Sequence, residues 1–474
     1  MTTGRSFIQH IKLLFIAVLT LAFLGAGLSL PSTAEAQNKK NQSQAKAQKS
    51  GAKSSSKKNS TGKSGSQSSK KTQAQKAAEL PWPQNLLTLV GDGAVLVMDT
   101  HAPRGATKEL YAHNAEREYV PASILKIVTS AAALEFLGPD YRFKTDFLLT
   151  KDKDLWIVGY GDPYLVSEEL TRIVNDLQEK GLKEVRNIYL DSSYFERDLI
   201  LDGNTQTRNP YDAYNGALAV NFNTLNFKKN KKGHVVKAAN HLPLTPMALD
   251  MAKKFKKSGT YCLNISESPA EAELHAGQTF KAHLEEAGVK VKGEIYAGQT
   301  APSKRKVFHR HVSSRSLDET LKELMKYSNN FMTNQIFLTM GAELYGAPAN
   351  LDKAQKAMDA YFKKHSLPRI VMGDGSGLSR QTTLTARQMA AVLEVVEANR
   401  HIFSSRDDGR VRCKTGTMSD IKTLAGFMER PDAPDQPLSF VILLNGATYT
   451  SATRDQVLGL LKHEFITSSP SAGR

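Results

Sequence analysis

The chain has 474 residues, of which 40% are hydrophobic, and a formal net charge of +16. Such a chain can bury a substantial core, suggests about two or three domains, and is neither globally disordered nor a polytopic membrane protein. Residues 37–78 hold 11 Lys and no acidic residue and residues 1–36 add a net +1, which leaves +4 of the +16 for residues 79–474. The charge therefore gives no reason to expect nucleic acid as a partner of the folded part.

Residues 1–36 have the features of a secretory signal peptide. Arg5 and Lys12 precede an apolar run at residues 13–30, and Ala34-Glu35-Ala36 offers small residues for cleavage after Ala36. We therefore expect an exported protein of the periplasm or the extracytoplasmic cell envelope. Because the apolar run approaches the length that spans a bilayer, an uncleaved membrane anchor is the alternative. No Cys lies nearby, so a lipid anchor is not expected.

Residues 37–79 are rich in Lys, Ser and Gln and contain almost no large apolar side chain. Such a segment cannot offset its ordering entropy by burial, so the composition predicts a disordered tether. Its simplest role is a solvated linker. The alternative is a polycation that holds the protein on anionic cell-envelope material by electrostatic attraction.

The folded part is expected to begin near residue 80. Alternating residues at 93–99 predict a first strand, and Pro121 opens a helix that runs through an Ala-rich stretch and stops at Gly138-Pro139. The first predicted segment of the folded part, residues 80–144, thus combines a strand with a helix.

Residues 145–304 show short β-like runs between turn residues, such as 155–158 and 187–190, with one helical stretch at 168–179. We therefore predict an inserted β-rich domain. Lys-rich clusters at residues 228–232 and 253–257 are most simply solvated turns or helix faces.

Helices return in residues 305–474. Ser316 and Glu319 form a capping box ahead of an amphipathic run that ends at Tyr327. Further helices are expected at 350–365 and 385–399, then two strands at 410–414 and 438–444 and a closing helix at 453–465. The order of elements predicts one α/β domain made from both ends of the chain, with another domain inserted.

The two Cys residues, Cys262 and Cys413, fall in different predicted domains. Two separate buried thiols are the favoured interpretation, and a disulfide, which export would permit, is the alternative. His309 and His311 have the i, i+2 spacing of a strand and no third candidate ligand nearby, so a zinc site is not expected.

The first candidate motif is Ser123-Ile124-Leu125-Lys126, at the predicted start of a helix. A Ser and a Lys three residues apart lie on one helix face, where the amine can take the hydroxyl proton. The helix amino terminus adds free N–H groups beside an acyl oxyanion. Alone, this common pattern also fits a capped helix with a surface Lys.

The second motif, Ser328-Asn329-Asn330, follows the capped helix. Its Ser can relay a proton and its last Asn can hydrogen-bond a substrate backbone, although a polar turn would look the same. The third motif, Lys414-Thr415-Gly416-Thr417, follows a β-like run. Lys414 and Thr415 can hold a substrate carboxylate, and Gly416 allows close approach to the backbone.

The three motifs are far more informative together than singly. They occur in order at a helix start, a loop between helices and a strand, and this combination predicts one shared acyl-transfer site.

The motifs resemble those of the serine penicillin-recognising enzymes, and among these the D-alanyl-D-alanine carboxypeptidase/endopeptidase family of low-molecular-mass (class C) penicillin-binding proteins. About 200 residues separate Ser123 from Ser328, similar to the extra domains of that family, for which a compact class A β-lactamase has no room. Residues 155–163, 217–223 and 374–380 are similar as well. The resemblance implies an α/β (α+β) fold with a serine β-lactamase/transpeptidase-like domain, an antiparallel sheet flanked by helices.

By this resemblance Ser123 attacks a D-Ala-D-Ala or D-Ala-diaminopimelate peptide bond, with Lys126 as general base and Ser328 helping to protonate the leaving amine. The backbone N–H groups of Ser123 and Thr417 would form the oxyanion hole. The residues that would bind the substrate are Asn330, Lys414, Thr415, Gly416 and Thr417. Peptidoglycan peptides and β-lactam antibiotics are the implied partners, and no metal or organic cofactor is implied.

The sequence departs from the family in places. The second motif has Asn329 where the family usually has Asp, the insertion looks shorter than in the best-known members, and Cys413 is unusual before the third motif. The alternatives are a β-lactamase, for which no Glu-containing deacylation motif is evident, and a non-catalytic peptidoglycan-binding or scaffold protein. A Gly-rich loop at residues 374–380 either borders the site or is a tight turn between elements.

Overall fold

The structure is a computed structural model that describes residues 80–103, 108–265, 268–304 and 306–467. The predicted signal peptide, its alternative as an anchor, and the predicted tether lie outside the described residues. Within those ranges no helix is long and apolar enough to cross a membrane.

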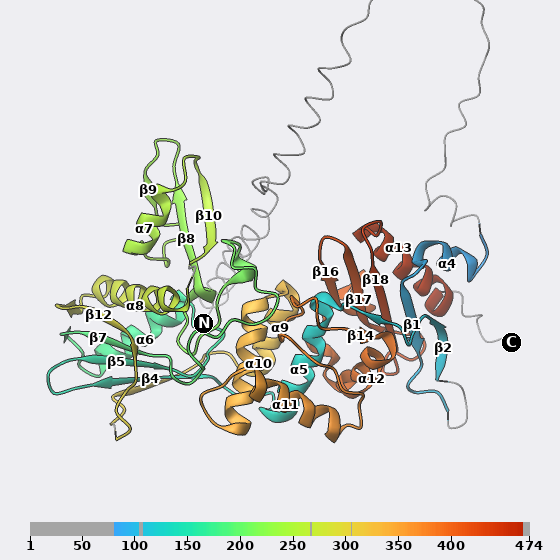
Figure 1. Cartoon of the computed structure of the whole chain (residues 1–474), viewed down its shortest axis with the longest axis horizontal. Coiled ribbons are helices and arrows are strands. Elements are labelled where there is room, and N and C mark those ends of the chain that lie inside the picture. Colours follow the sequence, from blue (N-terminus) through green and yellow to red (C-terminus); the bar gives the residue numbers. More distant parts are fainter. Residues whose placement is uncertain (1–79, 104–107, 266–267, 305, 468–474) are drawn as a thin grey trace, which may run out of the picture. The chain divides into compact units, whose positions relative to one another are not determined.

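Two segments from opposite ends of the chain build one antiparallel sheet. Its strands in spatial order are β15 (Ser404–Arg406), β16 (Val411–Thr417), β17 (Ile421–Met428), β18 (Leu438–Asn445), β1 (Ala94–Met98) and β2 (Glu109–His113). Figure 1 shows the early strands β1 and β2 continuing the sheet of late strands. This sheet confirms the predicted fold class.

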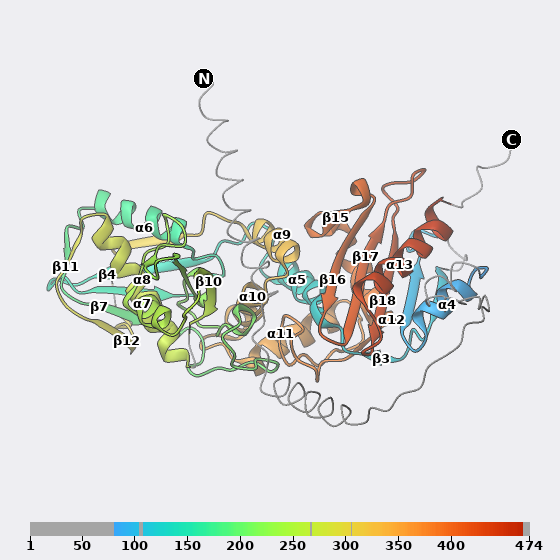
Figure 2. The ribbon, with the colours of Figure 1, turned by 90° about the horizontal axis from the view of Figure 1, so that it is seen from above.

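Helices cover both faces of this sheet (Figure 2). On one face α4 (Gln84–Val90) and α13 (Ser451–Lys462) share a core with alternate residues of β1, β17 and β18. On the other face α12 (Ala386–Val396) packs on β1 and β18 and is joined by α5 (Leu125–Phe136). The short turn η2 (Ala122–Ile124) before α5 contacts β16 and β17.

A helical layer adjoins α5. It consists of α9 (Leu317–Tyr327), α10 (Asn330–Tyr345) and α11 (Leu351–Lys364). The capping box predicted at Ser316 and Glu319 is formed, and it starts α9. The sequence did not predict α10, because residues 331–342 are all buried and the helix has no polar stripe.

The prediction of the C-terminal strands was incomplete. Two strands were predicted after residue 410, but β17 lies between them and pairs with both. Every residue of β17 is buried, so the alternation that identifies a half-exposed strand is missing.

A second, mixed sheet lies between the first and second motifs in sequence. Its strands in spatial order are β12 (Ile295–Gln299), β7 (Ile188–Asp191), β5 (Leu155–Gly159), β4 (Lys144–Leu149) and β13 (His309–Val312). Helices α6 (Ser167–Glu179) and α8 (Pro269–Glu286) contribute to the core on one of its faces. Since β13 lies beyond residue 304, this sheet extends past the predicted insertion, and the domain boundaries stay a prediction.

The prediction of one helix in the insertion was wrong. Besides α6, the structure has α7 (Pro246–Lys253) and the long α8. Gly277 and Thr279 are weak helix formers that obscured α8. Its start carries a clear signal that could have found it, since Ser268 caps the helix and Pro269 occupies its first position.

A small lobe stands beside the mixed sheet. It consists of α7 and three antiparallel strands, β8 (Thr224–Lys229), β9 (Val235–Val236) and β10 (Gly259–Asn264). The remaining short strands form two pairs, β3 (Glu118–Tyr119) with β14 (Leu384–Thr385) and β6 (Glu184–Val185) with β11 (Lys290–Val291).

Both cysteines are free thiols, so they do not form the alternative disulfide; Cys413 is buried and Cys262 half-buried. His309 and His311 lie on β13, with Nε2 atoms 3.5 Å from Asp176 and 3.3 Å from Glu169. No group of three potential metal ligands occurs in the part of the chain that the structure describes.

Candidate active site

Ser123 lies in η2, the turn directly before α5. The residue before it, Ala122, has a φ of 48°, in the left-handed region that side chains other than glycine rarely adopt. Ala122 is also buried, which fixes this unusual turn in place. The surrounding packing thus holds the backbone of Ser123 in a defined position.

Lys126 is fully buried one turn after Ser123. Its Nζ lies 3.0 Å from the Ser123 Oγ. The same amine donates to the Asn330 Oδ1 and to the Ser376 carbonyl oxygen, each at 2.7 Å. The structure thus brings the first and second motifs together on one amine.

The surroundings of Lys126 favour its neutral form. Burial lowers the pKa of Lys126 well below its ordinary value, and the positive charge of Lys414 lowers it further, whereas Asp374 raises it. A neutral amine can accept a proton, so this environment suits a general base.

The second motif forms the turn between α9 and α10. Ser328 ends α9 with a left-handed backbone, at a φ of 53°. Asn329 caps α10, because its side chain accepts a hydrogen bond from the Met332 N–H at 3.0 Å. Asn and Asp are both good capping residues, which accounts for the departure at the middle position. Asn330 begins α10 and turns its side chain to Lys126.

The third motif forms the end of β16. Lys414 is buried, and its Nζ donates to the Thr415 carbonyl oxygen at 2.8 Å. Burial lowers the pKa of Lys414 to about 7. Lys414 is close enough to Lys126 for their charges to interact.

Gly416 brings β16 against the turn that carries Ser123. A Cβ at Gly416 would lie 2.1 Å from the Thr423 Oγ1, 2.7 Å from the Pro121 carbonyl oxygen and 3.0 Å from the Ser123 nitrogen. No side chain fits there without moving the turn.

The N–H of Thr417 points away from β17. Antiparallel pairing directs successive N–H groups to opposite sides of a strand, and the next N–H, that of Met418, donates to the Ile421 carbonyl oxygen at 3.0 Å. The Thr417 N–H therefore points to the open edge of β16, where β15 reaches only as far as Cys413.

The loop at residues 374–380 borders the site. The buried carboxylate of Asp374 accepts hydrogen bonds from the backbone N–H groups of residues 376–379 and from the Ser376 hydroxyl. Gly377 has a φ of 84°, and a Cβ there would lie 2.0 Å from the Ala122 carbonyl oxygen. The sequence did not decide whether this loop borders the site or is a tight turn between elements. Its Gly and Asp residues were the available signal for a position at the site.

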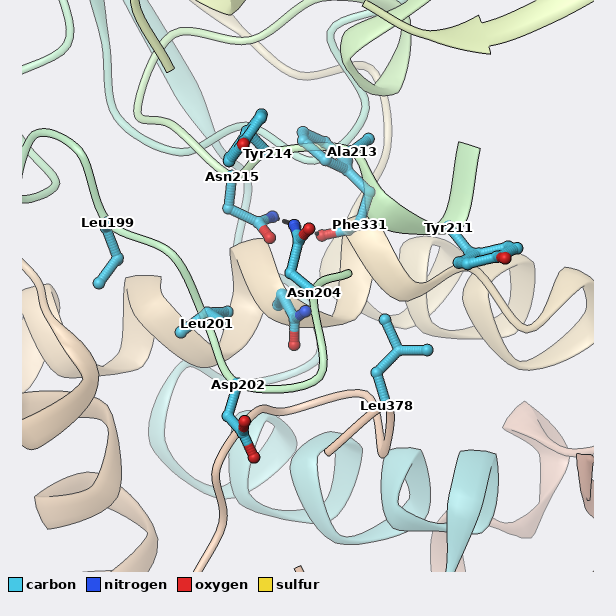
Figure 3. A pocket seen from close by; sticks show the side chains of 11 residues that line it. Leu199, Leu201, Asp202, Asn204, Tyr211, Ala213, Tyr214, Asn215, Phe331 and Leu378 are labelled. Carbon is cyan, nitrogen blue, oxygen red and sulfur yellow. Dashed lines mark hydrogen bonds between the residues drawn. The ribbon is translucent and has the colours of Figure 1, made fainter. Parts of the chain in front are cut away.

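The insertion reaches the same region. A small pocket lies between the segment at residues 199–215, α10 and Leu378 (Figure 3). Asn215 donates to the Phe331 carbonyl oxygen and to Gln335, each at 3.0 Å. Ser379 donates to Asp202. The insertion therefore contacts both the second motif's helix and the 374–380 loop.

Two curated relatives cover most of the chain. A D-alanyl-D-alanine carboxypeptidase of Actinomadura sp. strain R39 is 27% identical over 426 residues, 74% of this chain and 77% of that protein. The D-alanyl-D-alanine carboxypeptidase DacB of Haemophilus influenzae is 23% identical over 397 residues, 70% of this chain and 82% of that protein.

The fold is similar to that of penicillin binding protein 4 (dacB) from Haemophilus influenzae, with a TM-score of 0.66 and 19% identity over 81% of this chain and 99% of that one. The sequence itself matches the D-Ala-D-Ala carboxypeptidase 3 (S13) family at residues 93–260 and 256–405. The chain therefore belongs to the D-Ala-D-Ala carboxypeptidase 3 (S13) family of serine peptidases, as its three motifs predicted.

Proposed function

We propose that this protein is an exported serine peptidase that cleaves D-Ala-D-Ala or D-Ala-diaminopimelate bonds in peptidoglycan stem peptides through an acyl-enzyme on Ser123. The observation that carries the proposal is the position of the Lys126 amine, 3.0 Å from the Ser123 hydroxyl and held by Asn330 and Ser376. The family and its relatives support the substrate class.

The hydrogen bonds of Lys126 suit a base. A neutral amine has two N–H groups and one lone pair. Asn330 Oδ1 and the Ser376 carbonyl oxygen can accept only, so they take the two N–H groups. The lone pair then faces the Ser123 O–H, and it receives that proton when the oxygen attacks the substrate carbonyl.

The tetrahedral oxyanion would be held by the backbone N–H groups of Ser123 and Thr417. Gly416 supports this arrangement because it lets β16 approach the Ser123 nitrogen. Fixed donors aimed at a developing oxyanion commonly supply the largest catalytic contribution.

Ser328 would pass a proton from Lys126 to the leaving amine, so that the C–N bond breaks and the D-Ala or the diaminopimelate residue departs as a neutral amine. Asn330 would orient the peptide backbone, and Lys414 with Thr415 would hold the terminal carboxylate. Water then attacks the ester, Lys126 takes its proton, and the proton returns to the Ser123 oxygen as the shortened peptide leaves.

Labelled penicillin tests the nucleophile. The purified protein should form a long-lived adduct that mass spectrometry locates on Ser123, and Ser123→Ala should form none. Ser130→Ala is a matched control on the same helix, since that buried hydroxyl has no hydrogen-bond partner among the described residues. Adduct on the Ser123→Ala variant would defeat the assignment, and rapid penicillin turnover would favour the β-lactamase alternative.

Digestion of purified muropeptides distinguishes the two peptidase activities. Loss of terminal D-Ala indicates a carboxypeptidase, and conversion of cross-linked dimers to monomers indicates an endopeptidase. The insertion contacts α10 and the 374–380 loop, and these contacts support a role for it in shaping the region that binds the substrate.

The Lys-rich segment at residues 37–79 supports electrostatic attachment to anionic cell-envelope material, because it carries a high density of positive charge. Deleting residues 37–78 should leave penicillin acylation intact and weaken salt-sensitive binding to isolated cell envelopes. A sharp fall in acylation would instead make the segment part of the enzyme.

A further inference from the structure

The two Lys-rich clusters of the insertion meet at one end of the small lobe. They are about 25 residues apart in sequence, but Lys229 on β8 pairs with both Gly259 at the start of β10 and Val235 at the start of β9. The turn after β8 and the segment after α7 therefore lie at the same end. We call this end the polybasic tip, defined by six exposed residues: Lys228, Lys231, Lys232, Lys254, Lys256 and Lys257.

The tip is remote from the attachment of the lobe. At the opposite end of the ladder Asn264 pairs with Thr224. There the Asn264 N–H donates to the Arg208 carbonyl oxygen at 2.9 Å and the Ile265 N–H to the Asn223 carbonyl oxygen at 3.3 Å. The lobe is thus anchored at one end and carries its lysines at the other. In Figure 1, β8 and β10 run side by side between these two ends.

The charge of the folded part is concentrated in this lobe. Residues 228–257 contain nine Lys and one acidic residue, Asp250, a net +8. Residues 79–474 carry +4 in total, so the rest of that range has a net charge of −4. The tip is therefore a positive end on an otherwise acidic enzyme.

Neighbouring lysines have partners among the described residues, but those of the tip do not. Lys229 donates to the Phe255 carbonyl oxygen at 2.6 Å, Lys253 pairs with Asp250 at 2.7 Å, and Lys237 pairs with Glu286 at 2.5 Å. None of the six tip side chains has an ion pair or hydrogen bond to a described residue.

The backbone under the tip is fixed. The Asn230 side chain accepts hydrogen bonds from the Lys232 N–H at 2.9 Å and from the His234 N–H at 3.0 Å, which orders the turn. Val236, opposite Lys228 in the ladder, is 38% exposed. Ordered turns with unpaired cationic side chains keep the charges available to a partner.

We propose that the polybasic tip docks on an anionic phospholipid membrane surface. Six exposed cations at the free end of a lobe can be engaged together by a plane of phosphate charges. Clusters of four to eight basic side chains bind such surfaces, with each side chain near the surface contributing. The site is separate from Ser123 and does not depend on the proposed reaction.

The test uses the chain from residue 37 onward, without the predicted signal peptide, and vesicles of known composition. Sedimentation should show binding to vesicles containing phosphatidylglycerol and little binding to pure phosphatidylcholine. Lys231, Lys232, Lys256 and Lys257 are changed to Gln in the tip variant. The control variant changes four dispersed exposed lysines to Gln instead: Lys151, Lys180, Lys356 and Lys363. Both variants keep the tether and the same net charge.

The tip variant should partition onto anionic vesicles at least about tenfold more weakly than the control variant, and Arg in place of the four lysines should restore binding. Equal binding of the two Gln variants would overturn the proposal. If the tip variant lost binding to soluble polyphosphate while its binding to vesicles was unchanged, the tip would be assigned to a soluble polyanion. That result would also overturn the proposal. Penicillin acylation, expected to be equal in all variants, reports separately on the proposed function.

Discussion

The amine of Lys126 donates a hydrogen bond to the backbone carbonyl of Ser376, 2.7 Å away, although 250 residues separate the two in the chain. Ser376 belongs to none of the three motifs. Its loop is held by Asp374, by the Gly375 N–H donating to Asn334 at 2.9 Å, and by Thr129 donating to the Gly375 carbonyl oxygen at 2.7 Å. The position and pKa of the predicted base therefore depend on this loop as well as on the motifs.

Replacing Asp374 with Asn tests that dependence. An amide offers one acceptor oxygen where the carboxylate offers two, so buried N–H groups lose their partners at roughly 1–3 kcal/mol each. We expect acylation to slow at least about tenfold. Because Asp374 raises the pKa of Lys126, removing its charge should also move the acid limb of kcat/KM to lower pH. The pH profile of acylation measures both effects, and Asp359→Asn is the control. If the acid limb does not move in Asp374→Asn, the electrostatic part of the prediction is wrong.

Lys414 should set the alkaline limb. Burial lowers the pKa of Lys414 to about 7, and only its charged form can hold a carboxylate. As pH rises through this pKa the charge is lost, so kcat/KM for a peptide substrate should fall above about pH 7. In Lys414→Arg the limb should disappear, because a guanidinium stays charged. Lys253→Arg, on the surface, should keep it. Persistence of the limb in Lys414→Arg would assign it to another group.

Gly416→Ala should inactivate the enzyme without unfolding it. The new Cβ would overlap the Thr423 hydroxyl and press on the Ser123 nitrogen, displacing the proposed nucleophile and the proposed oxyanion donor. A misplacement of about 1 Å costs about 100-fold in rate, so we expect at least that loss in acylation. Gly459→Ala is the matched control on α13, where a Cβ meets nothing within 4 Å. It should leave acylation unchanged and raise the thermal midpoint. Normal acylation by Gly416→Ala would refute the close-contact argument.

His275 should make the protein sensitive to acid. It is buried on α8 with neither ring nitrogen hydrogen-bonded to a described residue, and burial lowers its pKa to about 3. The unfolded chain takes up a proton near pH 6.5, so stability falls as pH drops from there toward 3, by at most about 1.4 kcal/mol per pH unit from this group. His275→Gln should reduce that slope in urea titrations, whereas exposed His234→Gln should not. Equal slopes in the two variants would show that other groups govern acid unfolding.

The sequence predicted those parts of the molecule whose local signals agree with the fold. Amphipathic helices with capping boxes, such as α9, were found because a polar face and a cap are both visible in sequence. The central strand β17 and helix α10 were missed because burial on all sides removes the periodicity. What hides an element in sequence is thus its position at the centre of the fold.

The candidate site divides in a similar way. Ser123, Lys126 and Asn330 were predicted from short motifs, and the structure joins them on one amine. The contact with Ser376 was not predicted, because a backbone carbonyl carries no residue-type signal. The polybasic tip was hidden for another reason, since only the pairing of β8 with β10 brings its two lysine clusters together.

The pairing of β1 with β18 has a consequence for the timing of activity. The strand before Ser123 finds its partner only after about 350 further residues have been made, since Ala94 pairs with Leu443. Contacts of such long sequence separation form late in folding. A chain that emerges amino terminus first therefore holds Ser123 and Lys126 early but lacks the sheet that positions them. If the protein is exported as proposed, it would become catalytically active only on the far side of the membrane, after β18 has crossed and has paired with β1.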